Sequence, residues 1–131
     1  MMNSKILIAK AVEAMENSYS PYSGFKVGAA LLTKSGKVFT GCNIENASYS
    51  PTNCAERTAF FKAVSDGERE FTAIAVVGGK DGEISSFCSP CGVCRQVMTE
   101  FCEKDFMIIL FDGKTTKAYT LEKLLPESFS I

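Results

Sequence analysis

The sequence predicts an α/β protein of three layers, α/β/α, in which helices cover both faces of a mixed five-stranded sheet. Stretches with apolar residues at helical spacing alternate along the chain with short apolar runs that are typical of buried strands. The turn Lys34-Ser35-Gly36 joins two strands as an antiparallel hairpin, whereas strands linked by helices favour parallel pairing. The length of 131 residues, 46% of them hydrophobic, suits a single domain over 1–131 that folds without disulfides.

The first half of the chain is expected to supply a helix, the hairpin and a second helix. The first helix covers 4–18, with Ser4 as its N-cap, because apolar residues recur every three or four positions behind this serine. The hairpin strands cover 26–33 and 37–43. A polar loop with a proline then leads to a helix over 53–65, which a glycine terminates.

The second half alternates strand and helix. Residues 71–77 form a largely apolar run that is typical of a buried strand. A helix over 90–102 follows, with Ser89 as its N-cap and a proline at the first helical position, where proline is tolerated. Three short elements complete the prediction, namely strands over 106–111 and 117–120 and a helix over 121–125.

Charge and composition exclude several classes of function. The chain has 14 basic and 15 acidic residues, and no two Lys or Arg residues are adjacent. It therefore lacks the basic stripe that binding of a nucleic acid polymer requires. The chain also has no His, which excludes Ser-His-Asp triads, Cys-His pairs and His-ligated metals.

The N-terminal region predicts a cytoplasmic protein with no membrane partner. The apolar run 6–9 between Lys5 and Lys10 is too short for the core of a signal peptide or for a membrane span. In the cytoplasm the six cysteines would stay reduced. Three cysteines within seven residues then suggest a metal site before a disulfide.

Two short motifs at predicted helix starts carry the candidate metal ligands. Cys91 and Cys94 are three residues apart, so they share one helical face and can bind one ion. Cys54 and Glu56 are two residues apart and can serve one site only beyond the helix tip, where Asn53 as N-cap would place them. The partial positive charge of a helix N-terminus stabilises thiolates, so two helix tips can converge on one ion.

Three thiolates are a suitable set of ligands for a catalytic Zn²⁺. They leave a fourth position open for water, whose pKa a catalytic zinc lowers to about 7. Because three anionic sulfurs weaken the Lewis acid, we expect a nearby cation to bond the sulfurs, and Arg57 is the candidate. The alternative for Arg57 is an ordinary solvated helix residue.

The position of Cys88 allows an alternative interpretation, a different kind of metal site. The spacing Cys88-x-x-Cys91-x-x-Cys94 resembles the start of an iron–sulfur run, although the expected fourth cysteine before a proline is missing. An iron–sulfur or structural-metal module without hydrolase activity is therefore the remote alternative. Cys42 and Cys102 are predicted to be buried apolar residues.

The motif Cys54-Ala55-Glu56, followed 35 residues after the glutamate by Pro-Cys-x-x-Cys, resembles the zinc-dependent nucleoside and nucleotide deaminases. The segments 25–30, 43–47, 54–57 and 89–97 together resemble the small homotetrameric cytidine deaminases. The likeness extends from about residue 20 to the C-terminus in order and spacing.

This resemblance implies an activity and roles for individual residues. One zinc ion per subunit would be held by Cys54, Cys91 and Cys94, and a hydroxide on the zinc would attack C4 of the pyrimidine. Glu56 would be the catalytic proton shuttle, since a carboxylate beside such a group can both accept and donate. The reaction would convert cytidine or deoxycytidine to uridine or deoxyuridine plus ammonia, in pyrimidine salvage.

The resemblance also implies a nucleoside site and a homotetramer. Phe25 would pack against the pyrimidine, Asn43 and Glu45 would bind ribose hydroxyls, and the backbone of Ala55 would contact the base. An amide and a carboxylate in one loop supply the donors and acceptors that ribose needs. Residues expected to reach a neighbouring subunit's site are Ala47, Tyr49 and Phe129.

Substrate choice stays open between two kinds of small molecule. The leading expectation is an ordinary nucleoside, and the alternative is another cytosine-bearing molecule such as a nucleoside antibiotic, because specificity depends on loop detail. A polynucleotide editor shares the zinc motif but would need a basic surface to hold a strand.

Overall fold

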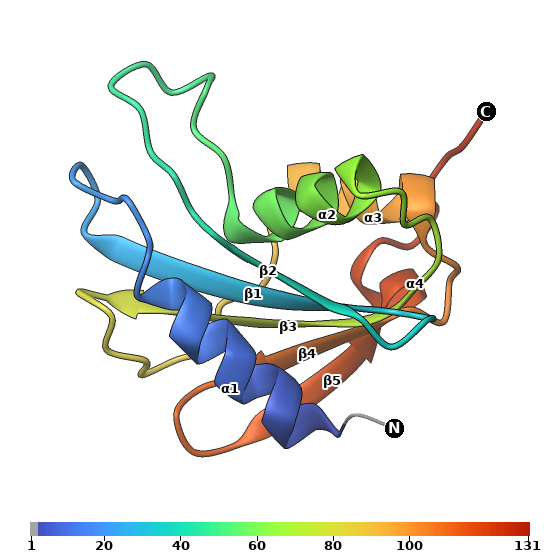
Figure 1. Ribbon diagram of the computed structural model, residues 1–131, viewed down its shortest axis with the longest axis horizontal. Helices are drawn as coiled ribbons and strands as arrows, with labels where there is room; N and C mark the ends of the chain where they lie inside the picture. The colour runs from blue at the N-terminus through green and yellow to red at the C-terminus, as the bar shows by residue number, and fades with distance from the viewer. Residues whose placement is uncertain (1–2) are drawn as a thin grey trace.

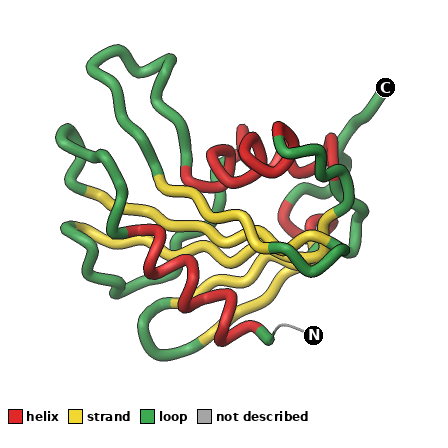
Figure 2. Tube along the Cα trace, viewed as in Figure 1, coloured by secondary structure: helices red, strands yellow, loops and turns green. Residues whose placement is uncertain are grey.

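The computed structural model describes residues 3–131, which form one five-stranded sheet with helices on both faces (Figures 1 and 2). The elements in chain order are α1 (Ser4–Met15), β1 (Phe25–Thr33), β2 (Val38–Cys42), α2 (Ala55–Ser65), β3 (Phe71–Lys80), α3 (Gly92–Phe101), β4 (Met107–Phe111), β5 (Thr116–Thr120) and α4 (Leu121–Leu124). Within the described residues, no helix is long and apolar enough to cross a membrane.

The sheet has the strand order β2-β1-β3-β4-β5. Only β3 and β4 run parallel, and they are the two strands that α3 connects. The other neighbouring pairs are antiparallel. The predicted mixed five-stranded sheet is therefore confirmed.

The two faces of the sheet support separate apolar cores. On β1, Ala29 and Leu31 face a core that also contains Phe60 of α2 and Met98 of α3. The alternate residues of the strand face α1, which covers the opposite side of the sheet (Figure 1). This alternation of side chains along the strands confirms the predicted three-layer α/β/α arrangement.

Two glycines let helices lie close to the sheet. A Cβ atom at Gly28 of β1 would lie 2.0 Å from the carbonyl oxygen of Ala11, so α1 contacts the strand backbone there. A Cβ atom at Gly41 of β2 would lie 2.4 Å from the carbonyl oxygen of Ala55 and 2.6 Å from the nitrogen of Ala59. The first turn of α2, which carries the candidate site residues, is therefore seated directly on β2.

The first helix differs from its predicted bounds at both ends. Asn3, not Ser4, is the N-cap, because its side-chain oxygen accepts a hydrogen bond from the Ile6 nitrogen at 3.0 Å. The helix ends at Met15 instead of residue 18.

The third strand is longer than the predicted 71–77 and continues to Lys80. Gly78 and Gly79 favour a loop by composition, yet both pair with residues of β1. A Cβ atom at Gly79 would lie 1.9 Å from the carbonyl oxygen of Glu83, so the close approach of backbone explains this glycine inside a strand.

Candidate metal centre and active site

The tips of α2 and α3 present the metal-ligand candidates. Cys54 is the N-cap of α2 and Cys91 is the N-cap of α3, and neither cysteine makes a side-chain capping bond. The predicted caps, Asn53 and Ser89, are wrong by one and two positions. The side chain of Asn53 instead donates to Thr58 Oγ1 at 3.1 Å. With cysteines in the cap positions, their sulfurs are free to bind a common ion at the two helix tips.

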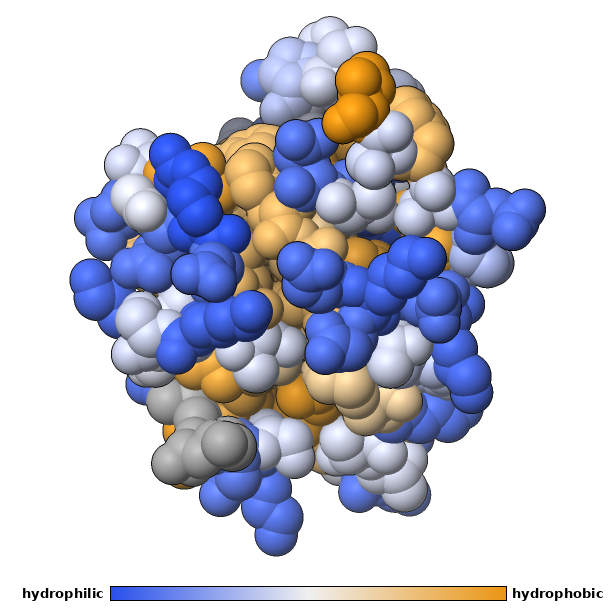
Figure 3. Space-filling view, turned by 90° about the vertical axis from the view of Figure 1, so that its right-hand side faces the viewer, coloured by the Kyte–Doolittle hydropathy of each residue, from blue (hydrophilic) through white to orange (hydrophobic). Residues whose placement is uncertain are grey.

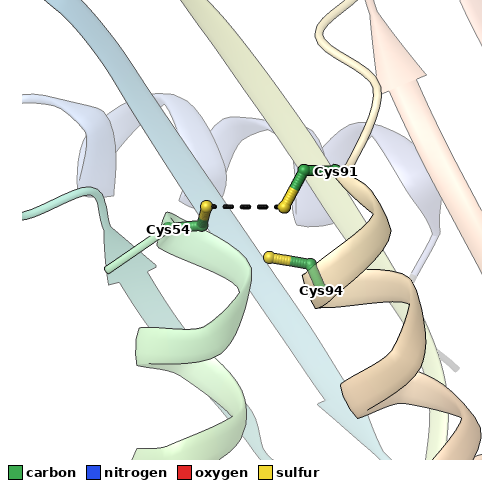
Figure 4. A group of neighbouring side chains, drawn as sticks. All are labelled: Cys54, Cys91 and Cys94. Atoms are coloured by element: carbon green, nitrogen blue, oxygen red, sulfur yellow. Dashed lines mark hydrogen bonds between the residues drawn. The ribbon is translucent and has the colours of Figure 1, made fainter. Parts of the chain in front are cut away.

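The structure brings Cys54, Cys91 and Cys94 together (Figure 4). Their sulfur atoms all lie within 4.8 Å of one another, and the Sγ atoms of Cys54 and Cys91 are 3.7 Å apart. Zinc at about 2.3 Å from each sulfur in a tetrahedral site implies sulfur–sulfur distances of about 3.8 Å, so the cluster fits this ion. Cys88 is outside the cluster found among residues 3–131, which argues against a four-cysteine site.

Arg57 contacts this cluster from within α2. Its Nη2 donates a hydrogen bond to Cys54 Sγ at 3.2 Å. A hydrogen bond with Cys94, followed by the one from Arg57, lowers the pKa of the Cys54 thiol to about 5. The Nε atom of Arg57 is buried and has no partner within the described part of the chain. The guanidinium is thus fixed beside a ligand sulfur, where it offsets negative charge.

Glu56 lies in the first turn of α2 and its residue is only 4% exposed. Burial raises the pKa of its carboxyl to about 7, and the charge of Cys54 acts in the same direction. Glu56 follows Cys54 by two residues, so this carboxyl belongs to the same helix tip as one sulfur of the cluster. The arrangement puts a shielded proton carrier beside the candidate metal centre.

Phe25 lies at the start of β1 and is 38% exposed. A Cβ atom at Gly78 of the neighbouring β3 would lie 3.0 Å from Phe25 Cε2 and 2.9 Å from Cys88 Sγ. The bare backbone of Gly78 therefore makes room for both side chains. Burial raises the pKa of the Cys88 thiol to about 12, so this cysteine is a packing residue.

Asn43 follows β2 and is buried. Its Nδ2 donates to the carbonyl oxygen of Phe25 at 2.8 Å, and its Oδ1 accepts from the Val27 nitrogen at 2.9 Å. The Ser18 hydroxyl also donates to Oδ1. The amide thus connects the end of β2 to the start of β1 and keeps one N–H for a further acceptor.

Glu45 lies in the loop between β2 and α2. Its Oε1 accepts from the nitrogens of Tyr22 and Ser23 at 3.0 and 3.1 Å, and its Oε2 accepts from the Ser23 hydroxyl. The hydroxyl bond is the largest of the effects that hold the pKa of this carboxyl below its ordinary value. The two predicted ribose-binding residues are therefore oriented by contacts to β1 and to the segment that leads into it.

Ala55 and the candidate cross-subunit residues occupy different surroundings. Ala55 is buried as the first residue of α2, whereas Ala47 and Tyr49 are exposed on the projecting loop between β2 and α2 (Figure 1). Tyr49 is 89% exposed and Phe129, in the C-terminal segment, is 68% exposed. That segment borders an open hollow of about 1200 Å³ beside α3 and α4, on the side of the molecule where Figure 3 shows apolar surface between hydrophilic groups. Within the single chain these three residues do not form part of the sulfur cluster.

Comparison with known proteins gives the family. A sequence model described as "Cytidine and deoxycytidylate deaminase zinc-binding region" matches residues 1–110. A protein of Sporosarcina psychrophila named cytidine deaminase is 53% identical over 130 residues, which cover 98% of this chain and 93% of that protein. The chain belongs to the cytidine and deoxycytidylate deaminase family.

Solved structures and a more distant relative agree with this membership. The crystal structure of a cytidine deaminase from Burkholderia pseudomallei matches with a TM-score of 0.90 at 49% identity, covering 98% of this chain and 100% of that one. A blasticidin-S deaminase of Bacillus cereus is 35% identical over 108 residues, 79% of this chain and 76% of that protein. The matched region is a zinc-binding region, and the cluster of Cys54, Cys91 and Cys94 is compatible with a site for this ion.

The deaminase fold also uses residues to which sequence reasoning assigned no role. Arg95 donates to the carbonyl oxygens of Pro90 and Leu124 at 2.8 and 2.6 Å and to Ser89 Oγ at 2.8 Å. It thereby ties the segment before Cys91 to the end of α4. Its position inside the 89–97 segment is a signal for it, whereas the sequence offers no comparable signal for Ser23, which bonds Glu45.

The remaining two cysteines of the deaminase are half-buried. Burial raises the pKa of both thiols, to about 12 for Cys102. Cys102 packs against the core between the sheet and α2, in line with its predicted apolar role, while Cys42 ends β2.

Proposed function

We propose that this chain is a zinc-dependent hydrolase that converts cytidine and deoxycytidine to uridine and deoxyuridine and releases ammonia. The observation that carries the proposal is the cluster of three cysteine sulfurs beside the buried carboxyl of Glu56. Zinc held by Cys54, Cys91 and Cys94 supplies a Lewis acid that activates water. Arg57 offsets part of the negative charge of the three sulfurs through its bond to Cys54.

Glu56 is the proton carrier of the proposed reaction. Its carboxylate takes one proton from the attacking water and delivers it to N3 of the pyrimidine as the oxygen bonds to C4. It then takes the second proton from the new C4 hydroxyl and delivers it to the amine, so that the C4–N bond breaks, ammonia leaves and a carbonyl remains at C4. Burial in the first turn of α2 supports this role, because a carboxyl excluded from bulk water exchanges its proton with the substrate instead of with solvent.

The strand ends and the loop after β2 recognise the nucleoside. The ring of Phe25 packs against the pyrimidine, and the main chain of Ala55 contacts the base. The free N–H of Asn43 and the remaining acceptor capacity of Glu45 bind ribose hydroxyls. Hydrogen bonds that already orient both side chains support the assignment, since they reduce the entropy lost on binding.

Residues 1–131 act as a single domain that assembles into a homotetramer in the cytoplasm and serves pyrimidine salvage. All the described helices pack on one sheet, which supports the single domain.

The neighbouring subunit's site is reached by three residues, Ala47, Tyr49 and Phe129. The exposure of the two aromatic rings supports such contacts. Size-exclusion chromatography with light scattering tests the tetramer, and a fully active monomer would contradict it. Neither a nucleic acid polymer nor a membrane is a partner.

The decisive experiment follows the ultraviolet change of cytidine and the release of ammonia with zinc-loaded protein. Protein stripped by a chelator is the matched control, and its activity should return when zinc is added back. Conversion that requires zinc supports the proposal. A zinc-loaded protein that leaves cytidine and deoxycytidine unchanged would overturn the substrate assignment.

The second candidate is a deaminase of another cytosine-bearing molecule such as a nucleoside antibiotic. The similarity to a blasticidin-S deaminase is the observation that favours testing it. The same assay with blasticidin S in place of cytidine separates the two. A higher kcat/KM for the antibiotic than for cytidine would make the antibiotic the substrate.

A further inference from the structure

We propose that Ser23 is a positioning residue that holds the ribose-facing carboxylate of Glu45 and the base-facing Phe25 in one fixed arrangement, so that sugar and base are recognised together. This inference rests on the proposed function and names a determinant of substrate recognition in the same site. Ser23 lies on the surface of the molecule, and its hydroxyl makes two specific contacts.

The hydroxyl of Ser23 lies between the two substrate-binding candidates. It donates a hydrogen bond to Glu45 Oε2 and accepts one from the Phe25 nitrogen at 2.9 Å. The main-chain nitrogens of Tyr22 and Ser23 donate to the other carboxylate oxygen. One hydroxyl group therefore links the carboxylate that faces the sugar to the residue whose ring faces the base.

The number of hydrogen bonds that the Glu45 carboxylate accepts is compatible with binding a sugar hydroxyl. A carboxylate offers about four acceptor positions. The Tyr22 and Ser23 nitrogens use two positions on Oε1, and the Ser23 hydroxyl uses one on Oε2. One position on Oε2 is left for a substrate hydroxyl, and the three bonds fix where it points.

The segment that carries Ser23 is itself anchored to the sheet. Lys80, the last residue of β3, donates from its Nζ atom to the Ser23 carbonyl oxygen at 2.7 Å. The Asp81 nitrogen donates to the Gly24 carbonyl oxygen at 2.7 Å, and Gly24 has a φ of +69°, which favours glycine. Although exposed, Ser23 is thus fixed relative to the sheet. Its hydroxyl can therefore hold Glu45 and Phe25 in a constant position relative to each other.

Phe25 is held from its other side by Asn43, whose Nδ2 donates to the Phe25 carbonyl oxygen. The main chain of Phe25 is thereby bonded at its N–H by Ser23 and at its carbonyl by Asn43. Among these contacts, only the Ser23 hydroxyl continues to Glu45. Removing it should uncouple the two halves of the nucleoside site while leaving the Asn43 bonds in place.

The test compares steady-state kinetics of zinc-loaded wild-type protein, Ser23→Ala, Glu45→Ala and the double variant. The substrates are cytidine and 2′,3′-dideoxycytidine, which lacks the 2′- and 3′-hydroxyls of the sugar. For Ser23→Ala we expect the KM for cytidine to rise about five- to tenfold, the effect of one hydrogen bond, with kcat within about twofold of wild type. The KM for the dideoxy compound should rise less. In the Glu45→Ala background, Ser23→Ala should change the KM for cytidine by less than about twofold, because its partner is already gone.

Two further variants control for folding. Ser35→Ala removes another loop serine that is bonded to a glutamate, Glu68, but at the opposite end of β1, and should match wild type. Ser23→Thr keeps the hydroxyl and should restore most of the affinity. Additive losses in the double variant, an equal loss for both substrates or no rescue by threonine would each overturn the role of Ser23.

Binding of the product uridine, measured by calorimetry, separates this inference from the proposed function. If cytidine is not converted but uridine affinity shows the same dependence on Ser23 and Glu45, the function fails and the role of Ser23 stands. If cytidine is converted but the dependence is absent, only the role of Ser23 fails. Absence of both conversion and binding would overturn both.

Discussion

Arg57 and Cys54 are joined within the first turn of α2 by a hydrogen bond of 3.2 Å from the guanidinium Nη2 to the thiol sulfur. The cation and the ligand are three residues apart on one rigid helix turn. Charge compensation at the metal centre is therefore built into the local geometry of a single element, and does not depend on a side chain arriving from a distant loop.

Replacing Arg57 by Gln should lower the affinity for zinc, because the thiolates then lose their nearest positive charge. We expect a decrease of about tenfold, at the lower end of the effect of such outer partners of metal ligands. Competition with a chromophoric chelator measures it. Arg69→Gln is the control, since Arg69 bonds main-chain oxygens at the other end of α2, those of Val64 and Glu68. Equal zinc affinities of Arg57→Gln and wild type would contradict the expectation.

Glu56→Gln should bind one zinc ion per chain and yet lose deaminase activity by about 10²- to 10⁴-fold, because an amide cannot carry the proton. Metal analysis and the ultraviolet assay give the two readings. Glu122→Gln is a matched control, since Glu122 is also a first-turn glutamate, on α4, where it is exposed. A variant that retains substantial activity with zinc bound would rule out Glu56 as the proton shuttle.

Gly78→Ala should impair nucleoside binding, because the new Cβ atom would lie 2.9 Å from Cys88 Sγ and 3.0 Å from Phe25 Cε2. We expect KM for cytidine to rise more than kcat falls, since the proposed role of the displaced Phe25 ring is to bind substrate and not to carry protons. Adding Cys88→Ala removes one of the two crowded neighbours and should restore part of the affinity. An unchanged KM in the single variant would show that Phe25 does not depend on this close approach.

Glu45 should titrate below the ordinary glutamate pKa of about 4.3 in the folded protein. Its hydrogen bond from the Ser23 hydroxyl, the bonds from the nitrogens of Ser23 and Tyr22 and the charge of Lys80 all favour the ionised form. Because the folded pKa lies below the unfolded one, the stabilisation is complete above the unfolded pKa and is lost as the pH falls through the folded pKa. Carboxyl carbon NMR measures the titration, and Ser23→Ala should move it upward. Titration at or above the ordinary value would contradict these bonds in solution.

The clustering of the three cysteines could be predicted because its information is local. Cys91 and Cys94 share a helical face through their spacing alone, and Cys54 with Glu56 required a helix tip, which the structure contains. The N-caps of the two helices were harder to predict. Asn53 is a favoured capping residue by type, but its side chain bonds Thr58, so the cap falls on a cysteine for which propensity gives no indication.

The contacts that orient the substrate-binding residues could not be predicted, because they join distant parts of the chain. Lys80 and Ser23 are 57 positions apart, and Glu45 and Ser23 are 22 apart. The extension of β3 through Gly78 was missed for a related reason. A glycine favours a loop by composition, and only the neighbouring side chains of the folded protein show that a close approach requires it there.

The sulfur cluster is carried by helix tips, whereas Phe25, Asn43 and Glu45 lie at strand ends and in the loop that follows. In the proposed function, the chemical step and most of the substrate recognition therefore belong to separate segments of the chain. An engineer who wants this scaffold to accept a different cytosine compound can randomise residues 18–25 and 43–47 and keep the two cysteine motifs unchanged. The same separation gives selection a way to diversify substrates without rebuilding the reaction.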